Sequence, residues 1–296
     1  MRIHHLNCIS QCALGGRLMD HRSKGLRAKL ACHCLLLETD RGLVLIDTGY
    51  GLRDVADPRS RLSAFFLGLN APELREELTA ARQIEALGYT ARDVRHIVLT
   101  HLDFDHAGGL DDFPAAAVHM MAFEVEDAVR QRTWLDRQRF RPQQWSSYDR
   151  WHAYESSTMN RWFGFDCVRD IPGLPPEILL VPLIGHTLGH AGVAVHGDRG
   201  WLLLAGDAYF DHHEMDVENP TCLPGLRLYQ WMMEKDRAAR LGNQQRLREL
   251  IRNQGQQVHV ICSHDPYELE ADALHSLDIP LVAGTLQEPA RTPTFP

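Results

Sequence analysis

Two histidines and two aspartates lie within six positions in the segment HLDFDHAGG, residues 101–109. Imidazole and carboxylate groups are the donors that first-row metal ions take in proteins. A regular helix or strand could not aim four side chains at this spacing at one point, whereas a loop leaving a strand could. Val94–Thr100 is a β-rich apolar run, and Gly108 and Gly109 let the backbone turn away close to the site. The alternative, in which these residues only cap a helix beginning at Asp105, accounts for fewer of them, so the motif predicts a metal site.

Three further polar residues follow strand-like runs later in the chain and complete the set of candidate ligands. They are His186 after Ile178–Ile184, Asp207 after Trp201–Leu204 and His264 after Val258–Cys262. Open sheets place their sites at the carboxyl ends of strands, so these residues can meet the first motif. A lone histidine is more often an ordinary core or surface residue, but together the seven predict one centre, built from His101, Asp103, Asp105, His106, His186, Asp207 and His264.

The elements that must position these residues are strands followed by helices in both halves of the chain. Besides the runs already named, β-rich patterns predict strands over Leu30–Glu38, Leu43–Asp47 and Gly192–His196, and another beginning at Val118. The turn residues Thr39–Gly42 and Gly197–Gly200 predict hairpins. Helical periodicity predicts helices over Leu74–Leu87, Phe123–Arg137 and Met232–Ile251. This order indicates an α/β (α+β) chain with sheets packed together, helices outside and a single domain over residues 1–296.

The motif set resembles the metallo-β-lactamase superfamily over nearly the whole chain, from LVLIDTG at residues 43–49 to His264. The resemblance implies an αβ/βα four-layer sandwich and a dinuclear metal-dependent hydrolase, in which a hydroxide between two divalent ions attacks a carbonyl carbon. Carried over residue by residue, the first ion would take His101, Asp103 and His186, and the second would take Asp105, His106 and His264. Asp207 would bridge the two ions, and Asp105 would also accept and return a proton.

One ligand position departs from the family, which usually has a histidine where this chain has Asp103. The centre then holds three carboxylates. Because carboxylate in place of imidazole favours harder ions, we expect Zn²⁺ first, with Mn²⁺ or Fe²⁺ as alternatives. A more anionic centre should also make the bound water less acidic.

Within the superfamily, HLDFDHAGG and GHTLGH are most similar to the N-acyl homoserine lactonase branch, which implies cleavage of a small ester or lactone. In that branch a tyrosine after the bridging aspartate helps to hold the lactone. Tyr209 is the candidate here, although it lies two residues after Asp207 where the family commonly has three, and Phe210 takes the third place. Phe65 and Phe66, in Leu62–Leu67, which is expected to be an apolar loop before the first helix, are candidate contacts for an acyl chain or ordinary core residues.

Two alternative functions stay open. A thioester hydrolase of the glyoxalase II type would want a basic patch for glutathione carboxylates, and Leu281–Pro296 offers little of one. A non-catalytic metal-binding protein of the same fold is disfavoured because all seven ligand positions are occupied by donors.

Several other features have both a structural and a functional interpretation. The aromatic-rich segment 134–165 is interpreted as an insertion that forms a lid, a pocket wall or a dimer surface. Asp211–Asp216 could line the site or be a solvated loop. Asp47 is expected to steady the metal loop, and His190 to be structural. Cys32, His33 and Cys34 are expected to be buried strand residues rather than a zinc site.

Composition restricts the partners and the location. A net charge of −8 and a pI near 6.1, without a dense run of basic residues, argue against nucleic-acid binding. We find no stretch of apolar residues long enough to span a membrane, and no export signal, so we expect a cytoplasmic enzyme with a small-molecule substrate. Seven scattered cysteines do not form a disulfide framework. A homodimer is compatible with the aromatic segment.

Overall fold

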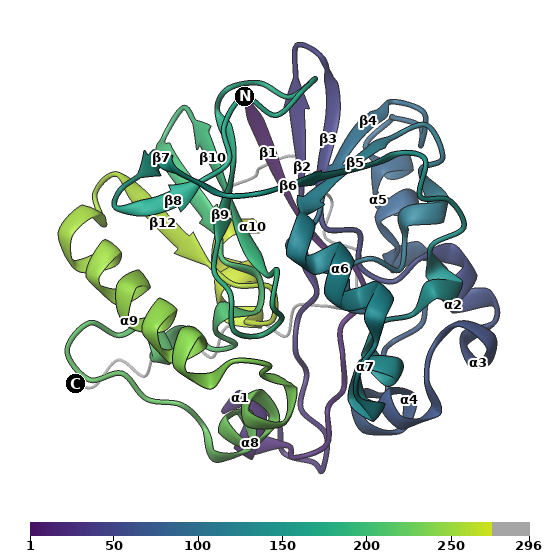
Figure 1. The fold of residues 1–296 in the computed structure, drawn as a ribbon. Coiled ribbons are helices and arrows are strands. Elements are labelled where there is room, and N and C mark those ends of the chain that lie inside the picture. The colour runs from purple at the N-terminus through teal and green to yellow at the C-terminus, as the bar shows by residue number, and fades with distance from the viewer. Residues whose placement is uncertain (274–296) are drawn as a thin grey trace, which may run out of the picture.

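The computed structural model describes residues 1–273 and has two β-sheets face to face with helices outside, an αβ/βα sandwich (Figure 1). The predicted fold class is therefore confirmed. One sheet has six strands in chain order: β1 Arg2–Asn7, β2 His33–Thr39, β3 Gly42–Ile46, β4 Val94–Val98, β5 Ala117–Met121 and β6 Trp151–Tyr154. The other has four strands in the order β12 Val258–Ile261, β11 Gly200–Leu204, β10 Ala191–Gly197 and β9 Ile178–Pro182.

Strict alternation of side chains explains why the sheets pack in this way. In β2 and β3, Leu35, Leu37, Val44 and Ile46 face the second sheet and pack against residues such as Leu180 of β9. Their neighbours Leu36 and Leu45 face outward instead. There they meet the helical layer of the first half. Since both faces of each central strand are covered, the strands read as continuous apolar runs rather than as alternating ones.

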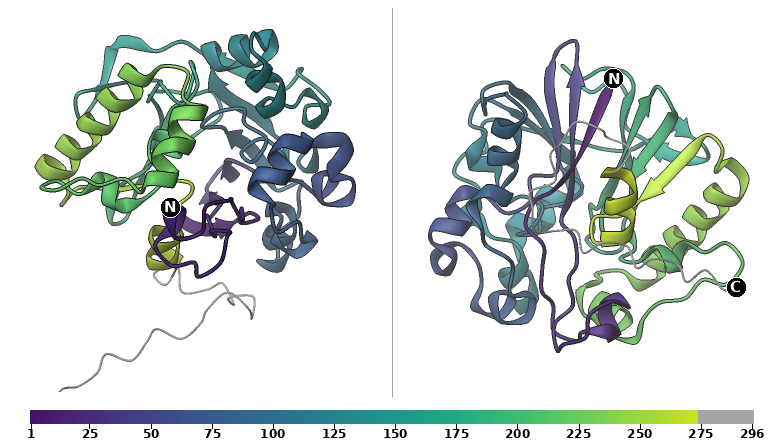
Figure 2. Two further views of the ribbon diagram at one scale, coloured as in Figure 1. Left: turned by 90° about the horizontal axis from the view of Figure 1, so that it is seen from below. Right: turned by 180° about the vertical axis from the view of Figure 1, so that it is seen from behind.

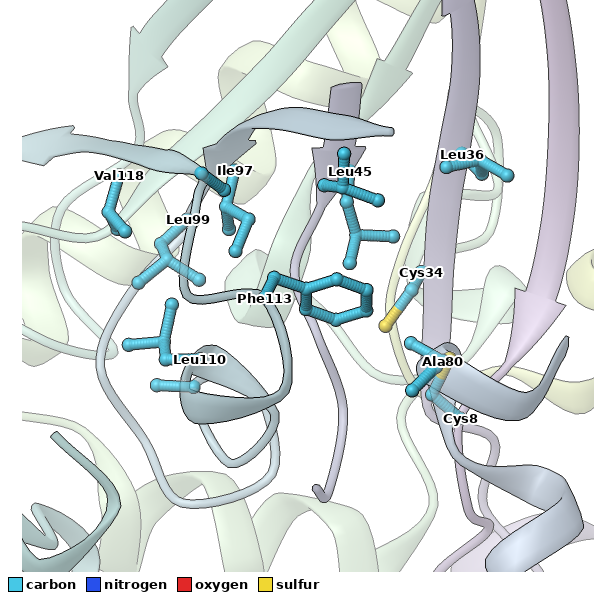
Figure 3. Close-up of a cluster of buried hydrophobic side chains, with 14 of the residues drawn as sticks. Cys8, Cys34, Leu36, Leu45, Ala80, Ile97, Leu99, Leu110, Phe113 and Val118 are labelled. Carbon is cyan, nitrogen blue, oxygen red and sulfur yellow. The ribbon is translucent and has the colours of Figure 1, made fainter. Parts of the chain in front are cut away.

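The outer core of the first half lies directly beneath the metal motif. Figure 3 shows Phe113 and Leu110 close to Ile97 and Leu99, with Ala80 of helix α5 (Ala80–Ala86) nearby. Leu110 belongs to the 3-10 turn η2 (Leu110–Asp112), which follows the motif immediately. This packing fixes both ends of the loop, β4 on entry and η2 on exit.

The outer face of the second sheet is covered by α9 (Arg237–Gln254), and that of the first by α5 and α6 (Ala122–Arg130), as Figures 1 and 2 show. Further helical elements are α1 Arg17–Asp20, α2 Leu52–Ala56, α3 Pro58–Arg61, α4 Ala64–Asn70, η1 Glu76–Leu78, α7 Trp134–Arg139, η3 Pro142–Gln144, η4 Gly206–Ala208, η5 His212–Met215, α8 Pro224–Met233 and α10 Pro266–Ala273. None of the helices in residues 1–273 combines the length and apolar character needed to cross a bilayer.

Three predicted helices are shorter or divided, because capping residues interrupt the periodic pattern. The predicted helix Phe123–Arg137 ends at Gln131, which has a φ of 42°, and Thr133 then caps the new helix α7. Met232–Ile251 divides into α8 and α9, where the Asp236 side chain accepts a hydrogen bond from the Ala239 amide. Leu74–Leu87 becomes η1 followed by α5.

Two other segments also differ from expectation. Leu62–Leu67 is not a loop: Ser63 caps the start of helix α4, which contains Phe65 and Phe66. Strand β1 escaped prediction because its sequence RIHHLN contains two histidines; His5 nevertheless lies buried beside His33, with ring nitrogens 2.8 Å apart.

The aromatic-rich segment 134–165 contributes helices and strands to the main fold. It begins with α7, supplies the edge strand β6 and forms the ribbon of β7 (Ser157–Trp162) with β8 (Phe165–Cys167). Trp145 and Trp162 are buried, whereas Trp134 and Tyr148 are about half exposed. Its most consequential residue is not aromatic: Arg139, at the end of α7, enters the site described next.

Candidate metal centre

All seven predicted ligands meet at the carboxyl ends of the strands, and none is more than 4% exposed. The motif 101–109 follows β4, His186 follows β9, Asp207 follows β11 and His264 follows β12. The expectation that strand exits deliver the ligands is therefore correct. The centre lies between the two halves of the sandwich, which each contribute donors.

Four of the donors face one another at distances suited to one cation. His106 Nε2 lies 3.3 Å from Asp207 Oδ1, and His264 Nε2 lies 3.2 Å from the same oxygen. Asp105 Oδ2 lies 3.5 Å from His264 Nε2. Donors about 2 Å from a common tetrahedral ion are separated by about these lengths. We call Asp105, His106, Asp207 and His264 the acidic set.

Unpartnered buried atoms support cation binding here. Among the described residues, His106 Nε2, Asp207 Oδ1 and His101 Nε2 are buried without a hydrogen-bond partner. Buried polar atoms normally have a hydrogen-bond partner, so three unpartnered ligand atoms at one centre require an explanation. A divalent cation bound to these atoms would be their missing partner, and the residues therefore fit a metal ion.

The first predicted set, His101, Asp103 and His186, is also brought together, but with a companion. His186 Nε2 lies 3.0 Å and His101 Nε2 lies 3.4 Å from Asp103 Oδ2. The guanidinium of Arg139 contacts two of these three residues: its Nε donates to Asp103 Oδ1 at 2.7 Å, and its Nη2 donates to Asp103 Oδ2 and, at 2.7 Å, to His186 Nε2.

The pKa shifts of the candidate ligands differ between the acidic set and the set around Asp103. Burial alone would lower the pKa of His106, but the carboxylates of Asp207, Asp105 and Asp47 outweigh it and raise the pKa well above its ordinary value. On the other side, burial and then the charge of Arg139 lower the pKa of His186. Burial would raise the pKa of Asp103, yet Arg139 holds it well below the usual range. The acidic set attracts positive charge, whereas the set around Asp103 already has a cation.

Supporting residues fix the orientation of the ligands. Asp47, which follows β3, has a φ of 54°, and its Oδ2 lies 2.8 Å from His106 Nδ1. It also accepts hydrogen bonds from the amide and hydroxyl of Thr100. His190 accepts a hydrogen bond from the Asp207 amide and lies 2.8 Å from the Leu183 carbonyl. These contacts are those expected of a residue that steadies the metal loop, for Asp47, and of a structural histidine, for His190.

Asp47→Ala is expected to lower metal affinity by roughly 10- to 100-fold, because His106 then loses the carboxylate that fixes its tautomer and orientation. Competition against a fluorescent chelator measures this constant. Asp198→Ala, at an exposed turn, is the control and should leave the affinity unchanged. Equal affinities of Asp47→Ala and the unaltered chain would contradict the role of Asp47.

Glu124 on α6, which the sequence did not single out, joins the two loops that carry His101 and His186. Its carboxylate accepts hydrogen bonds from the Leu102 amide at 2.8 Å and from the Thr187 hydroxyl at 2.5 Å. Burial raises its pKa to about 7. A lone glutamate at the start of an amphipathic helix gives no signal of this function; only its complete burial reveals it.

Gly108 and Gly109 have a different role from the one expected. Neither has a positive φ. Instead, a Cβ on Gly108 would come within 2.3 Å of Asp54 Oδ2, and one on Gly109 within 3.1 Å of Thr48. The glycines are needed because the metal loop packs directly against the segment that follows β3.

The prediction for Tyr209 is wrong. Its ring is fully buried in the outer core of the second sheet, and its hydroxyl donates to Glu268 Oε1 at 2.9 Å. The neighbouring Phe210 covers the metal centre instead, stacking on His264 with a centroid distance of 5.0 Å. The residue that covers the centre is thus the third after Asp207, which is a phenylalanine in this chain, and not the second, which is Tyr209.

Tyr229 on α8 lies near the centre, as does Tyr50, whose buried hydroxyl has no hydrogen-bond partner among the described residues; sequence reasoning missed both. The ring of Tyr229 contacts Phe210 at 5.7 Å, and its oxygen accepts a hydrogen bond from Asn70 at 3.2 Å. Burial first, and then the carboxylate of Asp105, raise its pKa. Phe66 belongs to the same apolar cluster as Tyr229 and packs on Phe104 of the metal motif at 4.6 Å.

Asp211, His212 and His213, the first half of the stretch Asp211–Asp216, line a cavity of about 330 Å³. Phe210 forms part of the wall of this cavity. His212 lies 2.6 Å from Asp265, and His213 lies 2.7 Å from Asp211. Cys32 and Cys34 are buried free cysteines at the start of β2, as predicted, and Cys32 donates to the Asp105 carbonyl.

Comparisons with known proteins agree with this geometry. The family model of the metallo-beta-lactamase superfamily matches residues 27–244. A probable metallo-hydrolase of Mycobacterium tuberculosis is 39% identical over 275 residues, which cover 92% of this chain and 83% of the relative. An N-acyl homoserine lactonase of Bacillus thuringiensis is 26% identical over 213 residues, covering 70% of this chain and 77% of that protein.

Solved structures give the same fold. A variant of the B. thuringiensis protein AiiA, with N-decanoyl-L-homoserine bound at its active site, aligns with a TM-score of 0.68 at 21% identity. The alignment covers 91% of this chain and 95% of that one. With the matched family model, the 39% identical relative and seven buried ligands at strand exits, the chain belongs to the metallo-β-lactamase superfamily.

Proposed function

We propose that this hydrolase cleaves a small, uncharged ester or lactone of the acyl homoserine lactone type. The observation that carries the proposal is the acidic set, whose buried donors converge beside an apolar cluster and include two atoms, His106 Nε2 and Asp207 Oδ1, without a hydrogen-bond partner. Relatives named N-acyl homoserine lactonases support the choice of substrate. A divalent cation held by the acidic set would lower the pKa of a bound water from ~15.7 towards ~7 and so supply a nucleophile near neutral pH.

The protein's own groups manage protons and orientation. Asp105 is buried beside His264 and is contacted by the side-chain amide of Gln11, which steadies its Oδ2. Burial raises the pKa of Asp105. We propose that this carboxylate takes the proton of the attacking water and returns it to the leaving alkoxide.

Tyr229 is placed to hold the carbonyl oxygen of the substrate. Because its oxygen already accepts from Asn70, its own O–H remains available as a donor, and no acceptor for it is found within residues 1–273. The apolar cluster that contains Tyr229 also includes Phe65 and Phe66, which we propose as contacts for the acyl chain. Phe66 is buried, whereas Phe65 is half-buried against Trp134 at a centroid distance of 5.1 Å.

Tyr229→Phe is expected to lower kcat/KM by about fivefold, because one neutral hydrogen bond to the reacting carbonyl contributes about 1 kcal/mol. Metal content should not change, since the hydroxyl is not one of the predicted ligands. Steady-state kinetics and metal analysis on the same preparation measure both quantities. Tyr209→Phe is the matched control and should keep its activity; a larger loss of activity in Tyr209→Phe would reverse the assignment.

We propose the cavity beside Phe210 as a path by which a small substrate approaches the centre; Phe210 and Asp265 line it, whereas none of the seven candidate ligands does. Its volume of about 330 Å³ lies at the lower end of the range for ligand pockets. Its charged and titratable lining residues are three aspartates, one arginine and three histidines: Asp20, Asp211, Asp265, Arg22, His21, His212 and His213. This rim disfavours the carboxylates of a glutathione thioester. The tail Leu281–Pro296, considered as a basic patch, lies outside the described residues.

A substrate panel tests the proposal. We expect the metal-loaded protein to hydrolyse acyl homoserine lactones or aryl esters, and lactoylglutathione at least about tenfold more slowly. Preference for lactoylglutathione would establish the thioester alternative. Full metal content without turnover of any of the three would support a non-catalytic protein of the same fold.

A further inference from the structure

Arg139 is a buried arginine whose donors are all engaged within the metal centre. Its side chain is 1% exposed. Nε and Nη2 hold both oxygens of Asp103, and Nη2 also donates to His186 Nε2 at 2.7 Å. Nη1 donates to the Met233 carbonyl at 2.6 Å and to the His186 carbonyl at 3.5 Å. Five N–H groups thus have five contacts, and none is left over for a substrate.

These contacts use two of the three donors that a first metal ion would need; the third, His101 Nε2, is buried without a hydrogen-bond partner. A neutral imidazole nitrogen has one lone pair, and that of His186 Nε2 receives an N–H of Arg139. Asp103 Oδ2, the donor closest to His186, receives another. A guanidinium keeps its positive charge at any ordinary pH, so a divalent ion in the same place would be repelled in a site from which water is largely excluded.

The backbone fixes Arg139 in this position. Asp103 and Phe140 form an isolated antiparallel bridge, which ties the metal loop to the residue after Arg139. A capping box at Thr133 and Asp136 sets the start of α7, and Lys235 pairs with Asp136 at 2.9 Å. The arginine is therefore delivered by packed structure rather than by a surface loop.

We infer that the guanidinium of Arg139 takes the place of the first metal ion, so that the chain binds a single divalent cation on Asp105, His106, Asp207 and His264. Asp103 is then the partner of a fixed internal cation. This departs from the dinuclear centre that the family resemblance predicts, and it explains why a carboxylate replaces the usual histidine at position 103. Arg139 acts through its charge and its hold on His186; it is a positioning residue.

The wild-type protein provides the first test. Full-length protein is saturated with Zn²⁺, freed of excess metal by gel filtration and analysed for bound zinc; crystals of the same sample are measured at the zinc absorption edge. We expect one zinc per chain, with its anomalous peak among the acidic set. Two ions per chain, none, or a peak within ~2.5 Å of Asp103 Oδ2 and His186 Nε2 would overturn the inference.

Variants test the cause. Asp103→His combined with Arg139→Gln removes the internal cation and restores an imidazole, so bound zinc should rise from one to two per chain. Arg61→Gln is the matched control: it also breaks a buried arginine–aspartate pair, with Asp54 at 2.7 Å, but its count should remain one. A folded double variant, verified by circular dichroism, that still binds one zinc would contradict the role of Arg139.

The zinc count does not depend on the substrate, although the inference concerns the same centre as the proposed function. One bound ion without hydrolysis of the panel would contradict the proposed function alone. Two bound ions with lactone hydrolysis would contradict this inference alone.

Discussion

Asp207→Ala is expected to lower kcat/KM by at least about a thousandfold and to reduce bound metal to a small fraction of the wild-type content. A bound cation lowers the barrier by several kcal/mol, and each 1.36 kcal/mol corresponds to a factor of ten in rate. Asp207 is the hub of the centre: one of its oxygens lies within 3.3 Å of both His106 and His264, and the other lies 3.4 Å from His186. Its loss leaves the histidines without the carboxylate that they share.

The measurement is kinetics with metal analysis on the same sample. Asp216→Ala is the control, because Asp216 is exposed and only accepts backbone hydrogen bonds from Glu218 and Asn219. It should retain both metal and turnover. Wild-type turnover in Asp207→Ala with full metal content would remove Asp207 from the mechanism.

Glu268→Gln is expected to make the folded protein more stable than the wild type at alkaline pH. Burial and the nearby charge of Asp265 raise the pKa of Glu268 to about 8, from an ordinary value of 4.5. Between these two pH values the native state keeps a proton that the unfolded chain has released. The free energy of unfolding of the wild type must therefore fall as pH rises from 4.5 to 8, in total by about 4 kcal/mol.

Glutamine is neutral at every pH. Its oxygen can accept the hydrogen bond of the Cys262 amide, and its NH2 group can donate to the Tyr209 oxygen, which reverses the direction of the second bond. Chemical denaturation at pH 4.5, 7 and 9 should give similar stabilities at the lowest pH and a growing advantage of the variant above it. Glu270→Gln, on the exposed part of the same helix, should show little pH-dependent difference. A constant offset between Glu268→Gln and wild type at all three pH values would exclude a titrating Glu268.

Much of the centre could be predicted because metal binding restricts residue type, spacing and position at once. His101, Asp105 and His106 fall in a loop after an apolar run, and His264 repeats the arrangement far along the chain. The core strands were equally clear, since a strand such as β9 (Ile178–Pro182) is apolar throughout and covered on both faces.

The parts that escaped prediction depend on three-dimensional context. Arg139 lies 36 residues after Asp103, and nothing local marks it as internal; the only signal was the unusual carboxylate that it neutralises. The prediction for Tyr209 failed because this residue lies two positions after Asp207 rather than three, and its ring therefore points into the outer core. The break between α6 and α7 depends on the left-handed conformation of Gln131, which is not a typical residue for that conformation.

The connection between β1 and β2 has a consequence for how much of the chain is a working unit. Gln11 reaches Asp105 from this connection, and the Ala31 carbonyl lies 2.7 Å from Nδ1 of His264. The recognisable family span, 27–244, contains neither Gln11 nor His264. A protein truncated to that span would therefore lack the ligand His264 and the Gln11 contact to Asp105. Designs that fuse or exchange this domain must keep the residues before 27 and after 244.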